Sequence, residues 1–276
     1  MDIKRFISGI LGFPLVAVLF IFGNNYVVDI TCAVIAIMGL YEFYNAFKDK
    51  AKPIAEVGYF SALFIAGLHI INYHWWLLYL PILILLAFLK VILTKMKFNI
   101  NDLAITILGI VYIVGSIAFI PLIHGLEHGK ILVWYIFLAA WGTDIFAYLI
   151  GVKFGKHKFS KISPKKSIEG CIGGIIGAII FMLVYTICVN NLFNLGISYI
   201  YIAIIAIVLS VIGQIGDFAA STIKRYAGIK DFSNLIPGHG GLLDRMDSVM
   251  FVAPFIYLFF VLMWKSDPPC CFTIKI

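Results

Sequence analysis

Charged side chains are scarce in this sequence, and their scarcity is the first constraint on its class. Asp, Glu, Lys and Arg make up 13% of the 276 residues, whereas 62% are hydrophobic and the mean hydropathy is +1.03. A soluble globular domain carries about 25% charged residues, which it needs to cover its surface. The composition therefore excludes a soluble globule and predicts an integral membrane protein.

The sequence also lacks several features that would indicate other kinds of site or domain organisation. The five cysteines show no metal-ligand spacing and lie mostly in apolar runs, where cysteine behaves as a small hydrophobic residue. The segment from Gly151 to Lys156 lacks the spacing of a Walker A loop. No small-x-small cleavage site follows the first apolar run, so we expect an uncleaved anchor there. No internal repeat or linker marks a second domain.

Long apolar runs fill most of the chain instead. A transmembrane helix needs about 20 apolar residues, and we assign such helices to residues 6–22, 26–47, 57–73, 75–93, 103–123, 131–150, 171–189, 197–216 and 248–264. Only residues 72–74 separate the third and fourth runs, which leaves one broken hairpin as an alternative. We predict an all-α polytopic membrane helix bundle of about nine transmembrane helices. Its single domain, 1–276, has N-terminal helices in 1–130, helices and polar loops in 131–264, and a polar tail in 265–276.

Basic residues fall almost entirely on one side of these spans. With the N-terminus in the cytoplasm, Lys130, Lys265 and Lys275 lie outside and the other 18 of the 21 Lys and Arg lie inside. This distribution predicts an N-in, C-out protein. We expect a multi-pass protein of a cell membrane of the bacterial inner-membrane type, with the polar loops in the cytoplasm near anionic membrane lipids. Nucleic-acid binding is disfavoured, because the basic residues are interleaved with the spans.

One carboxylate lies inside the sixth span. Asp144, Tyr148 and Gly151 recur at i, i+4 and i+7, with Ala140 and Ala147 on the same side, so we expect Asp144 to face a tightly packed neighbouring helix. A structural carboxylate hydrogen-bonded across helices and a catalytic or metal-binding group both fit this position.

The loop after this span is rich in cations and hydroxyls. Its Ser163, Lys165, Lys166 and Ser167 precede a helix start with glycines at positions 170, 173, 174 and 177. Cations, hydroxyls and a helix N-terminus together favour an anion site. An ordinary positive-inside loop has the same composition, and that alternative stays open.

A second polar segment, residues 213–247, carries a dense group of ionisable side chains between two apolar runs. Such a density is costly in a membrane protein unless the residues do chemistry. One set lines a single face if the eighth span continues as a helix past the membrane surface: Gln214, Asp217, Ser221 and Lys224.

After this helix, the sequence Pro-Gly-His-Gly-Gly at 237–241 supplies backbone that can approach a ligand closely, and the next helix places Asp244, Asp247 and Ser248 on one face. Asp217 opposite Asp244 and Asp247 predicts a cluster of three carboxylates, whose mutual repulsion a hard divalent cation removes. Oxygen ligands favour Mg2+ over zinc. In the alternative, the acids merely pair with nearby cations, namely Lys224, Arg225 and Arg245.

Carboxylate-held Mg2+ beside Lys, Arg and glycine backbone is typical of phosphoryl or nucleotidyl transfer, where positioning and charge neutralisation provide most of the catalysis. A location at the membrane surface indicates a lipid substrate. An ion-coupled transporter is the competing class, with Asp144 and Asp217 in an ion pathway. It predicts polar residues near the midplane of several helices and a repeat, whereas here the polar residues gather at one surface.

These residues resemble the phosphatidate cytidylyltransferase (CDP-diacylglycerol synthase) family. Its pattern S-x-x-K-R-x4-K-D-x5-P-G-H-G-G-x2-D-R-x-D is matched in full from Ser221 to Asp247. Two positions depart from the family, since Ser167 stands where threonine is usual and Ala220 where many members carry glutamate. The resemblance covers roughly the C-terminal half, because residues 1–130 match only as apolar spans.

The resemblance implies transfer of a cytidylyl group from CTP to phosphatidate, which gives CDP-diacylglycerol and pyrophosphate. It also implies that the enzyme requires Mg2+, forms a homodimer and can bind a monovalent cation such as K+ as a second ion. The implied catalytic residues are Asp217, Lys224, Arg225, His239, Asp244, Arg245 and Asp247, and the implied metal ligands are Asp217, Asp244, Asp247 and Asp144. Substrate contacts are expected from Ser163, Lys165, Lys166, Ser167, Ser221, Lys230, Gly238, Gly240 and Gly241. The close alternative is a CTP-dependent transferase or kinase that acts on another membrane lipid.

Overall fold

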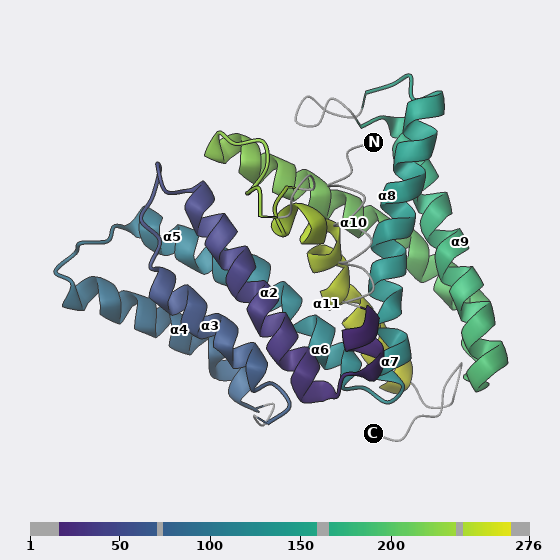
Figure 1. Cartoon of the computed structure of the whole chain (residues 1–276), viewed down its shortest axis with the longest axis horizontal. Helices are drawn as coiled ribbons and strands as arrows, with labels where there is room; N and C mark the ends of the chain where they lie inside the picture. The colour runs from purple at the N-terminus through teal and green to yellow at the C-terminus, as the bar shows by residue number, and fades with distance from the viewer. Residues whose placement is uncertain (1–16, 71–73, 159–165, 236–239, 266–276) are drawn as a thin grey trace. The chain divides into compact units, whose positions relative to one another are not determined.

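The computed structural model describes residues 17–70, 74–158, 166–235 and 240–265 (Figure 1). Every element in these ranges is helical and no β-strand forms within them, although one isolated antiparallel bridge joins Lys158 to Ser167. The all-α prediction is confirmed. Helices suit such an apolar chain, because lipid offers no hydrogen bonds to the backbone and a helix satisfies its own.

The elements in chain order are α2 Asn25–Ala46, α3 Ala55–Ala66, α4 His74–Leu93, α5 Ile100–Gly109, the π-helix η1 Ile110–Gly115, α6 Phe119–His124, α7 Gly129–Leu132, α8 Trp134–Phe154, α9 Ile168–Phe193, α10 Tyr199–Ala227 and α11 Leu243–Lys265. Side chains cap three of the helix starts. Asn24, Asn99 and Ser167 each accept a hydrogen bond from a backbone N–H in the first turn of α2, α5 and α9, which satisfies donors that the helix leaves unpaired.

The protein is a multi-pass membrane protein. In the described part of the chain, 6 helical stretches are long and apolar enough to cross a bilayer, namely Asn25–Ala46, Ile100–His124, Gly129–Phe154, Ile168–Phe193, Tyr199–Ala227 and Leu243–Leu262. The predicted third and fourth spans correspond to shorter apolar helices, Ala55–Ala66 and Leu78–Leu93. Of the predicted first span only residues 17–22 are described, and they are helical. The count of nine and the N-in, C-out orientation stay predictions.

The chain divides into two compact units and passes between them at three points: in the connection from α6 to α7, within α10 and within α11. The first unit comprises the described parts of Met1–Gly125 and Lys224–Arg245. The second comprises those of Leu126–Ile223 and Met246–Ile276. Each unit is described below by itself.

In the first unit, α2 and α3 lie side by side (Figure 1). Their close approach depends on Gly58, since a Cβ there would lie 2.3 Å from the hydroxyl of Tyr44. That hydroxyl donates to the carbonyl of Thr106 at 3.1 Å, which ties α2 to α5. A buried apolar cluster that includes Ile54 and Leu83 fills the space between α3, α4 and α5.

In the second unit, α8 and α9 run side by side along much of their length (Figure 1). A Cβ at Gly177 would lie 2.4 Å from the carbonyl oxygen of Gly142, so the two backbones are in direct contact. Small residues that allow such contact are a main source of helix association in lipid. A buried hydrogen bond of 2.8 Å from Thr143 to Ser210 also joins α8 to α10.

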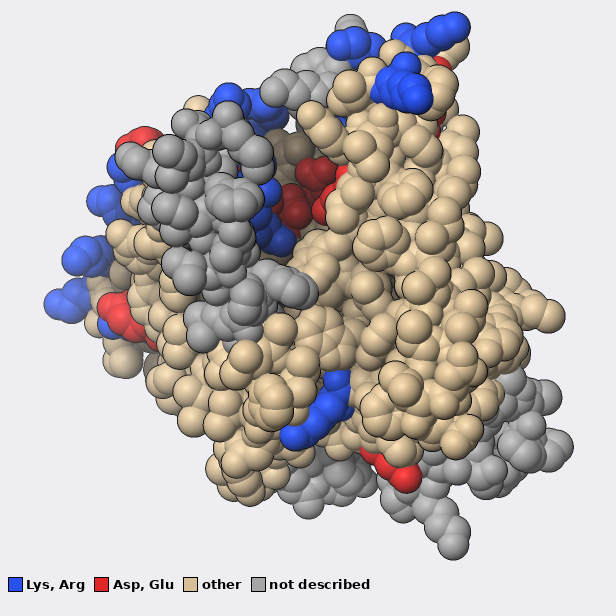
Figure 2. Space-filling view, turned by 45° about the vertical axis from the view of Figure 1, so that its right-hand side comes forward, with Lys and Arg blue, Asp and Glu red and all other residues tan. Residues whose placement is uncertain are grey.

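Large apolar side chains cover the outer faces of the helices. On α9, five of them at intervals of three or four residues are between 42% and 55% exposed: Ile172, Ile176, Ile180, Val184 and Ile187. Figure 2 shows residues other than Lys, Arg, Asp and Glu over most of the visible face. Such a surface is unfavourable in water and favourable in hydrocarbon, which agrees with the membrane assignment.

Candidate active site

Two helices carry most of the predicted polar residues. α10 continues to Ala227, well past the predicted end of its span at residue 216, and α11 starts at Leu243, ahead of the predicted start at 248. Both helical predictions for the polar segment are therefore confirmed. The residues on α10 are Gln214, Asp217, Ser221, Lys224 and Arg225, and those on α11 are Asp244, Arg245, Asp247 and Ser248.

Asp217 forms an ion pair with Lys166 in the second unit. The ammonium of Lys166 contacts Oδ2 of Asp217, and the two side chains are 26% and 27% exposed. The same ammonium lies 4.3 Å from the ring centroid of Phe218, an arrangement that favours a cation there. A predicted substrate-binding lysine and a predicted metal ligand thus come together where solvent reaches both.

Asp247 lies against the same part of α10. A Cβ at Gly216 would be 2.8 Å from the carbonyl oxygen of Asp247, so α11 touches the α10 backbone at the residue before Asp217. Asp247 is 8% exposed and Ser248 is 3% exposed. Among the described residues, the Oγ atom of Ser248 has no hydrogen-bond partner. A buried hydroxyl in that state is uncommon, and its oxygen can serve a cation or a polar substrate group.

Asp244 accepts three hydrogen bonds in the first unit. Its Oδ1 atom accepts from the ammonium of Lys224 at 2.6 Å, and its Oδ2 atom accepts from the backbone N–H groups of Phe232 and Gly241 at 2.9 and 3.0 Å. The side chain is 6% exposed and that of Lys224 is 14% exposed. Asp244 therefore holds the loop between α10 and α11 in shape, in addition to any contact with a ligand.

Two glycines of this loop, residues 228–242, have structural causes within the first unit. Gly240 adopts a φ of +84°, which strains any residue with a Cβ. A Cβ at Gly241 would lie 2.8 Å from Oε2 of Glu42 and 3.0 Å from the nitrogen of Ser233. Packing inside the protein thus accounts for both glycines, and their predicted role in substrate binding stays a prediction.

Glu42 is a residue that the sequence reasoning missed. It belongs to α2, is 1% exposed, and accepts hydrogen bonds from the hydroxyl of Ser233 at 2.5 Å and from the N–H groups of Leu242 and Leu243 at 2.9 Å each. One signal could have found it. An acid inside an apolar run of membrane-spanning length requires a partner, and α2 offers no basic residue in its last turn.

Hydrogen bonds join the two ends of the loop between α8 and α9. The Oγ atom of Ser167 accepts from the N–H of Gly170 at 3.1 Å, so this predicted substrate-binding residue is the N-cap of α9. Glu169 accepts from the ring of His157 at 2.7 Å, and the N–H of Ile168 donates to the carbonyl of His157 at 2.9 Å. The glycine-rich start of α9 serves packing against α8, as shown by Gly170, whose Cβ would lie 2.8 Å from the carbonyl oxygen of Ala147.

The structure confirms part of the predicted face of α8. Ala147 and Gly151 pack on α9, since a Cβ at Gly170 would lie 2.8 Å from the carbonyl oxygen of Ala147 and 3.2 Å from Cα of Gly151. Asp144 is exposed and Tyr148 is 70% exposed, so these two residues lie outside that tight contact. The catalytic or metal-binding role of Asp144 stays a prediction.

A family model described as the cytidylyltransferase family matches residues 3–263. The chain belongs to this family. The match extends through the N-terminal half, which the motif resemblance did not reach, and therefore includes α2 and Glu42 together with the polar segments on α10 and α11.

Relatives named phosphatidate cytidylyltransferase are similar to this chain. One from Bacillus subtilis (strain 168) is 37% identical over 181 residues, which cover 65% of this chain and 66% of the relative. One from Staphylococcus haemolyticus (strain JCSC1435) is 36% identical over 241 residues, or 83% of this chain and 88% of the relative. One from Staphylococcus saprophyticus is 40% identical over 171 residues, or 62% and 64%. In the first and third, the chain spans just under two thirds of the relative's length.

The structure describes some of the remaining predicted site residues and not others. Ser221 is half-buried, whereas Arg225, Lys230 and Arg245 are exposed. No group of three or more His, Cys, Asp or Glu side chains that could hold a metal forms within the described ranges. Asp217 and Asp247 belong to the second unit and Asp244 to the first, so the three-carboxylate cluster stays a prediction. The predictions outside the described residues are Ser163, Lys165, Gly238 and His239.

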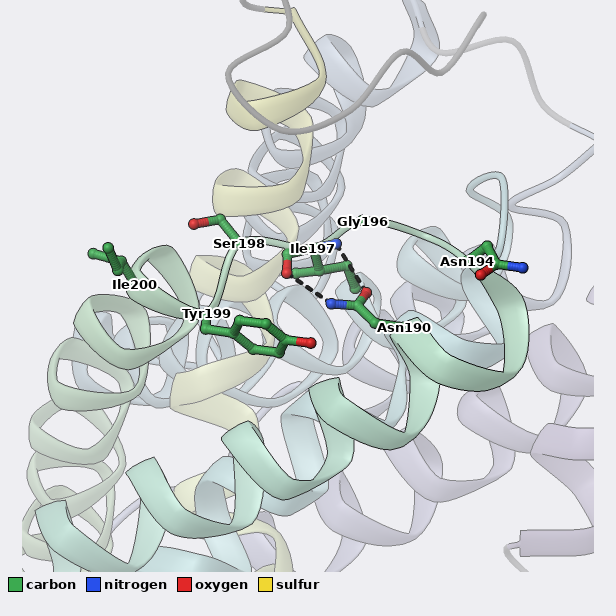
Figure 3. A pocket seen from close by; sticks show the side chains of 7 residues that line it. All are labelled: Asn190, Asn194, Gly196, Ile197, Ser198, Tyr199 and Ile200. Atoms are coloured by element: carbon green, nitrogen blue, oxygen red, sulfur yellow. Dashed lines mark hydrogen bonds between the residues drawn. The ribbon is translucent and has the colours of Figure 1, made fainter.

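An open depression at the connection between α9 and α10 is separate from these residues (Figure 3). Asn190 closes the connection by donating to the carbonyl of Ile197 and accepting from its N–H, both at 2.9 Å. The residues that line the depression carry no charge: Asn190, Asn194, Gly196, Ile197, Ser198, Tyr199 and Ile200. It therefore lacks the groups that would bind a nucleotide or a lipid phosphate.

Proposed function

We propose that this member of the cytidylyltransferase family transfers the cytidylyl group of CTP to phosphatidate, giving CDP-diacylglycerol and pyrophosphate. The observation that carries the proposal is the combination of the complete 221–247 pattern with relatives of 36 to 40% identity that bear this enzyme name. The basic and acidic residues of the pattern support it, since they suit a reaction between two phosphate compounds.

In the proposed reaction, an oxygen of the lipid phosphate attacks the α-phosphorus of CTP and pyrophosphate leaves. The attacking oxygen is already ionised at neutral pH, so the site needs no strong general base. Catalysis then depends on positioning and on neutralising negative charge. Lys166, Lys224, Arg225 and Arg245 neutralise the triphosphate and the lipid phosphate, and His239 donates a hydrogen bond from the glycine loop.

Mg2+ fits the oxygen donors that this chain supplies. Asp217 and Asp247 lie on helices that touch at Gly216, and the Ser248 oxygen beside them lacks a hydrogen-bond partner among the described residues. We propose that Asp217 and Asp244 hold the metal, with Asp247 and Asp144 as further ligands and K+ as a second cation. When bound, the metal neutralises phosphate oxygens and orients them. Because Lys166 and Lys224 pair with two of these acids, each lysine shifts from carboxylate to phosphate when substrate and metal bind.

The proposal includes the placement in the membrane. Nine transmembrane helices with the N-terminus in the cytoplasm bring the polar loops to the cytosolic face of a bacterial inner membrane, where CTP is dissolved. A homodimer follows from the family resemblance. The topology is tested in protein whose five native cysteines are replaced by serine, with single cysteines introduced at Lys48 or Lys130 and a membrane-impermeant reagent, because the proposal predicts labelling of intact cells only at position 130.

The function is tested by incubating purified protein in lipid nanodiscs with radiolabelled CTP and phosphatidate. We expect label in a chloroform-soluble product, its loss on adding EDTA, and its return on adding Mg2+. Parallel reactions with lipid alcohols and other lipid phosphates define the acceptor. Label that appears only with another acceptor would assign the chain to a different CTP-dependent enzyme, and label with none of them would reject cytidylyl transfer.

A further inference from the structure

We infer that Glu42 of α2 is a positioning residue for the described parts of the loop, 228–235 and 240–242, and for the start of α11, and that cytidylyl transfer depends on it. The inference rests on the proposed function for its catalytic part. Its structural part concerns only the first unit, where α2, the loop and the first turn of α11 contact one another.

The first argument is the geometry of the Glu42 carboxyl group. Its two oxygens receive one hydroxyl and two backbone N–H donors, from Ser233 on one side of the loop and from Leu242 and Leu243 on the other. Residues from both sides of the 237–241 glycine sequence therefore share a single acceptor group. Movement of either side breaks a hydrogen bond of a buried acid, which is costly in a nonpolar environment.

The second argument is that the Glu42 side chain, which comes from α2, lies at the N-terminus of another helix, α11. The N–H groups in the first turn of α11 lack helical partners, and the helix dipole favours negative charge there. Glu42 accepts from the N–H of Leu243, the first residue of α11, and from that of Leu242 just before it, while Asp244 accepts from the N–H of Gly241. Two acids of the protein thus bind three successive N–H groups at the start of α11.

The third argument is the tight packing of α2, and of the turn that follows it, against the two ends of this loop. One turn before Glu42, a Cβ at Gly39 would lie 3.1 Å from the Leu243 side chain. Beyond the end of α2, the Lys50 ammonium contacts the carbonyl of Tyr226 and lies 4.1 Å from the centroid of its ring. Gly39 of α2 and Lys50 in the turn after it therefore contact the start of α11 and the end of α10, which are the two ends of the loop.

A positioning role separates Glu42 from the residues proposed to contact substrate. Glu42 is 1% exposed and its oxygens are engaged by the loop, so it acts through Asp244 and the neighbouring backbone. A displacement of about 1 Å at reacting groups can cost on the order of 10²-fold in rate. Loss of Glu42 should therefore lower kcat and leave the KM for CTP nearly unchanged.

The test compares Glu42→Gln with Glu56→Gln in full-length protein in nanodiscs. Gln keeps the size of the side chain but replaces one acceptor oxygen with an N–H2 group, so one of the Leu242 and Leu243 donors loses its partner. We expect faster amide hydrogen exchange confined to residues 240–243 and a fall of about 10-fold or more in kcat. Glu56 is 68% exposed and pairs with Lys90 on α4, and its variant should match wild type in both measurements.

Ser233→Ala serves as a graded variant, because it removes the hydroxyl donor and keeps both backbone bonds to Glu42. We expect a smaller change than in Glu42→Gln, in the same peptide. Unchanged exchange and kcat in Glu42→Gln would overturn the inference, and faster exchange over all helices would show a general role in folding instead. If wild-type protein has no cytidylyltransferase activity, the proposed function fails, while the exchange measurement still decides whether Glu42 holds the loop.

Discussion

Asp244 and Asp217 are each paired with a lysine, but the two pairs differ in their surroundings. Asp244 is 6% exposed and accepts two backbone N–H groups in addition to Lys224, whereas Asp217 is 27% exposed and pairs with a lysine that is 26% exposed. The first acid holds a loop in shape, and the second is open to solvent. The two acids have the same predicted role as metal ligands, but only Asp244 also stabilises the structure around it. Mutations of each acid can distinguish these two contributions.

The largest effects are expected from Asp217→Asn and Asp244→Asn. Each should lower activity by about 10²-fold or more, since each removes a charge that the proposed site uses. Only Asp244→Asn should also lower stability, by roughly 1–3 kcal/mol, because its buried hydrogen bonds are weakened. Thermal unfolding in detergent measures the difference. Asp49→Asn, at an exposed loop position, is the control and should change neither quantity. Equal stability of the two acid variants would refute the contrast between them.

Intermediate effects are expected from the two lysines. Lys224→Met leaves Asp244 buried without its cation and should cost about 3 kcal/mol of stability. Lys166→Met should cost under about 1 kcal/mol, because that pair is partly solvated. Its main effect should be a higher KM for CTP, measured in the labelled-CTP assay. A larger loss of stability in Lys166→Met than in Lys224→Met would reverse the comparison.

The smallest effect is expected at the N-cap of α9. Ser167→Ala removes the acceptor for the N–H of Gly170 and should cost about 1 kcal/mol, which corresponds to a fall of a few degrees in Tm. Ser167→Thr retains a capping hydroxyl and should keep the wild-type Tm. If Ser167→Ala instead keeps its Tm and raises the KM for phosphatidate, the hydroxyl serves substrate and not the helix.

The sequence predicted those features that depend on local pattern. The helical extensions that carry Asp217 and Asp244 follow from spacing along single helices, and both are present. Features that depend on distant contacts were missed or misplaced. Glu42 meets Leu243 across 201 positions of the chain, and no periodicity connects them. On α8, the predicted contact with a neighbouring helix is present at Ala147 and Gly151 but does not include the exposed Asp144, because the glycines of α9 decide which residues are covered.

The length of α10 has a consequence for how a water-soluble nucleotide and a lipid can meet. Its 29 residues extend about 43 Å at 1.5 Å per residue, whereas the hydrocarbon core is about 30 Å thick. Measured from Tyr199, an aromatic residue typical of an interface, Asp217 lies about 27 Å along the helix axis. An upright α10 therefore places this acid about 3 Å inside the far boundary of the hydrocarbon core, next to the glycerol groups of the lipid. The acceptor lipid can react with its acyl chains still dissolved in the bilayer, and only the nucleotide has to travel.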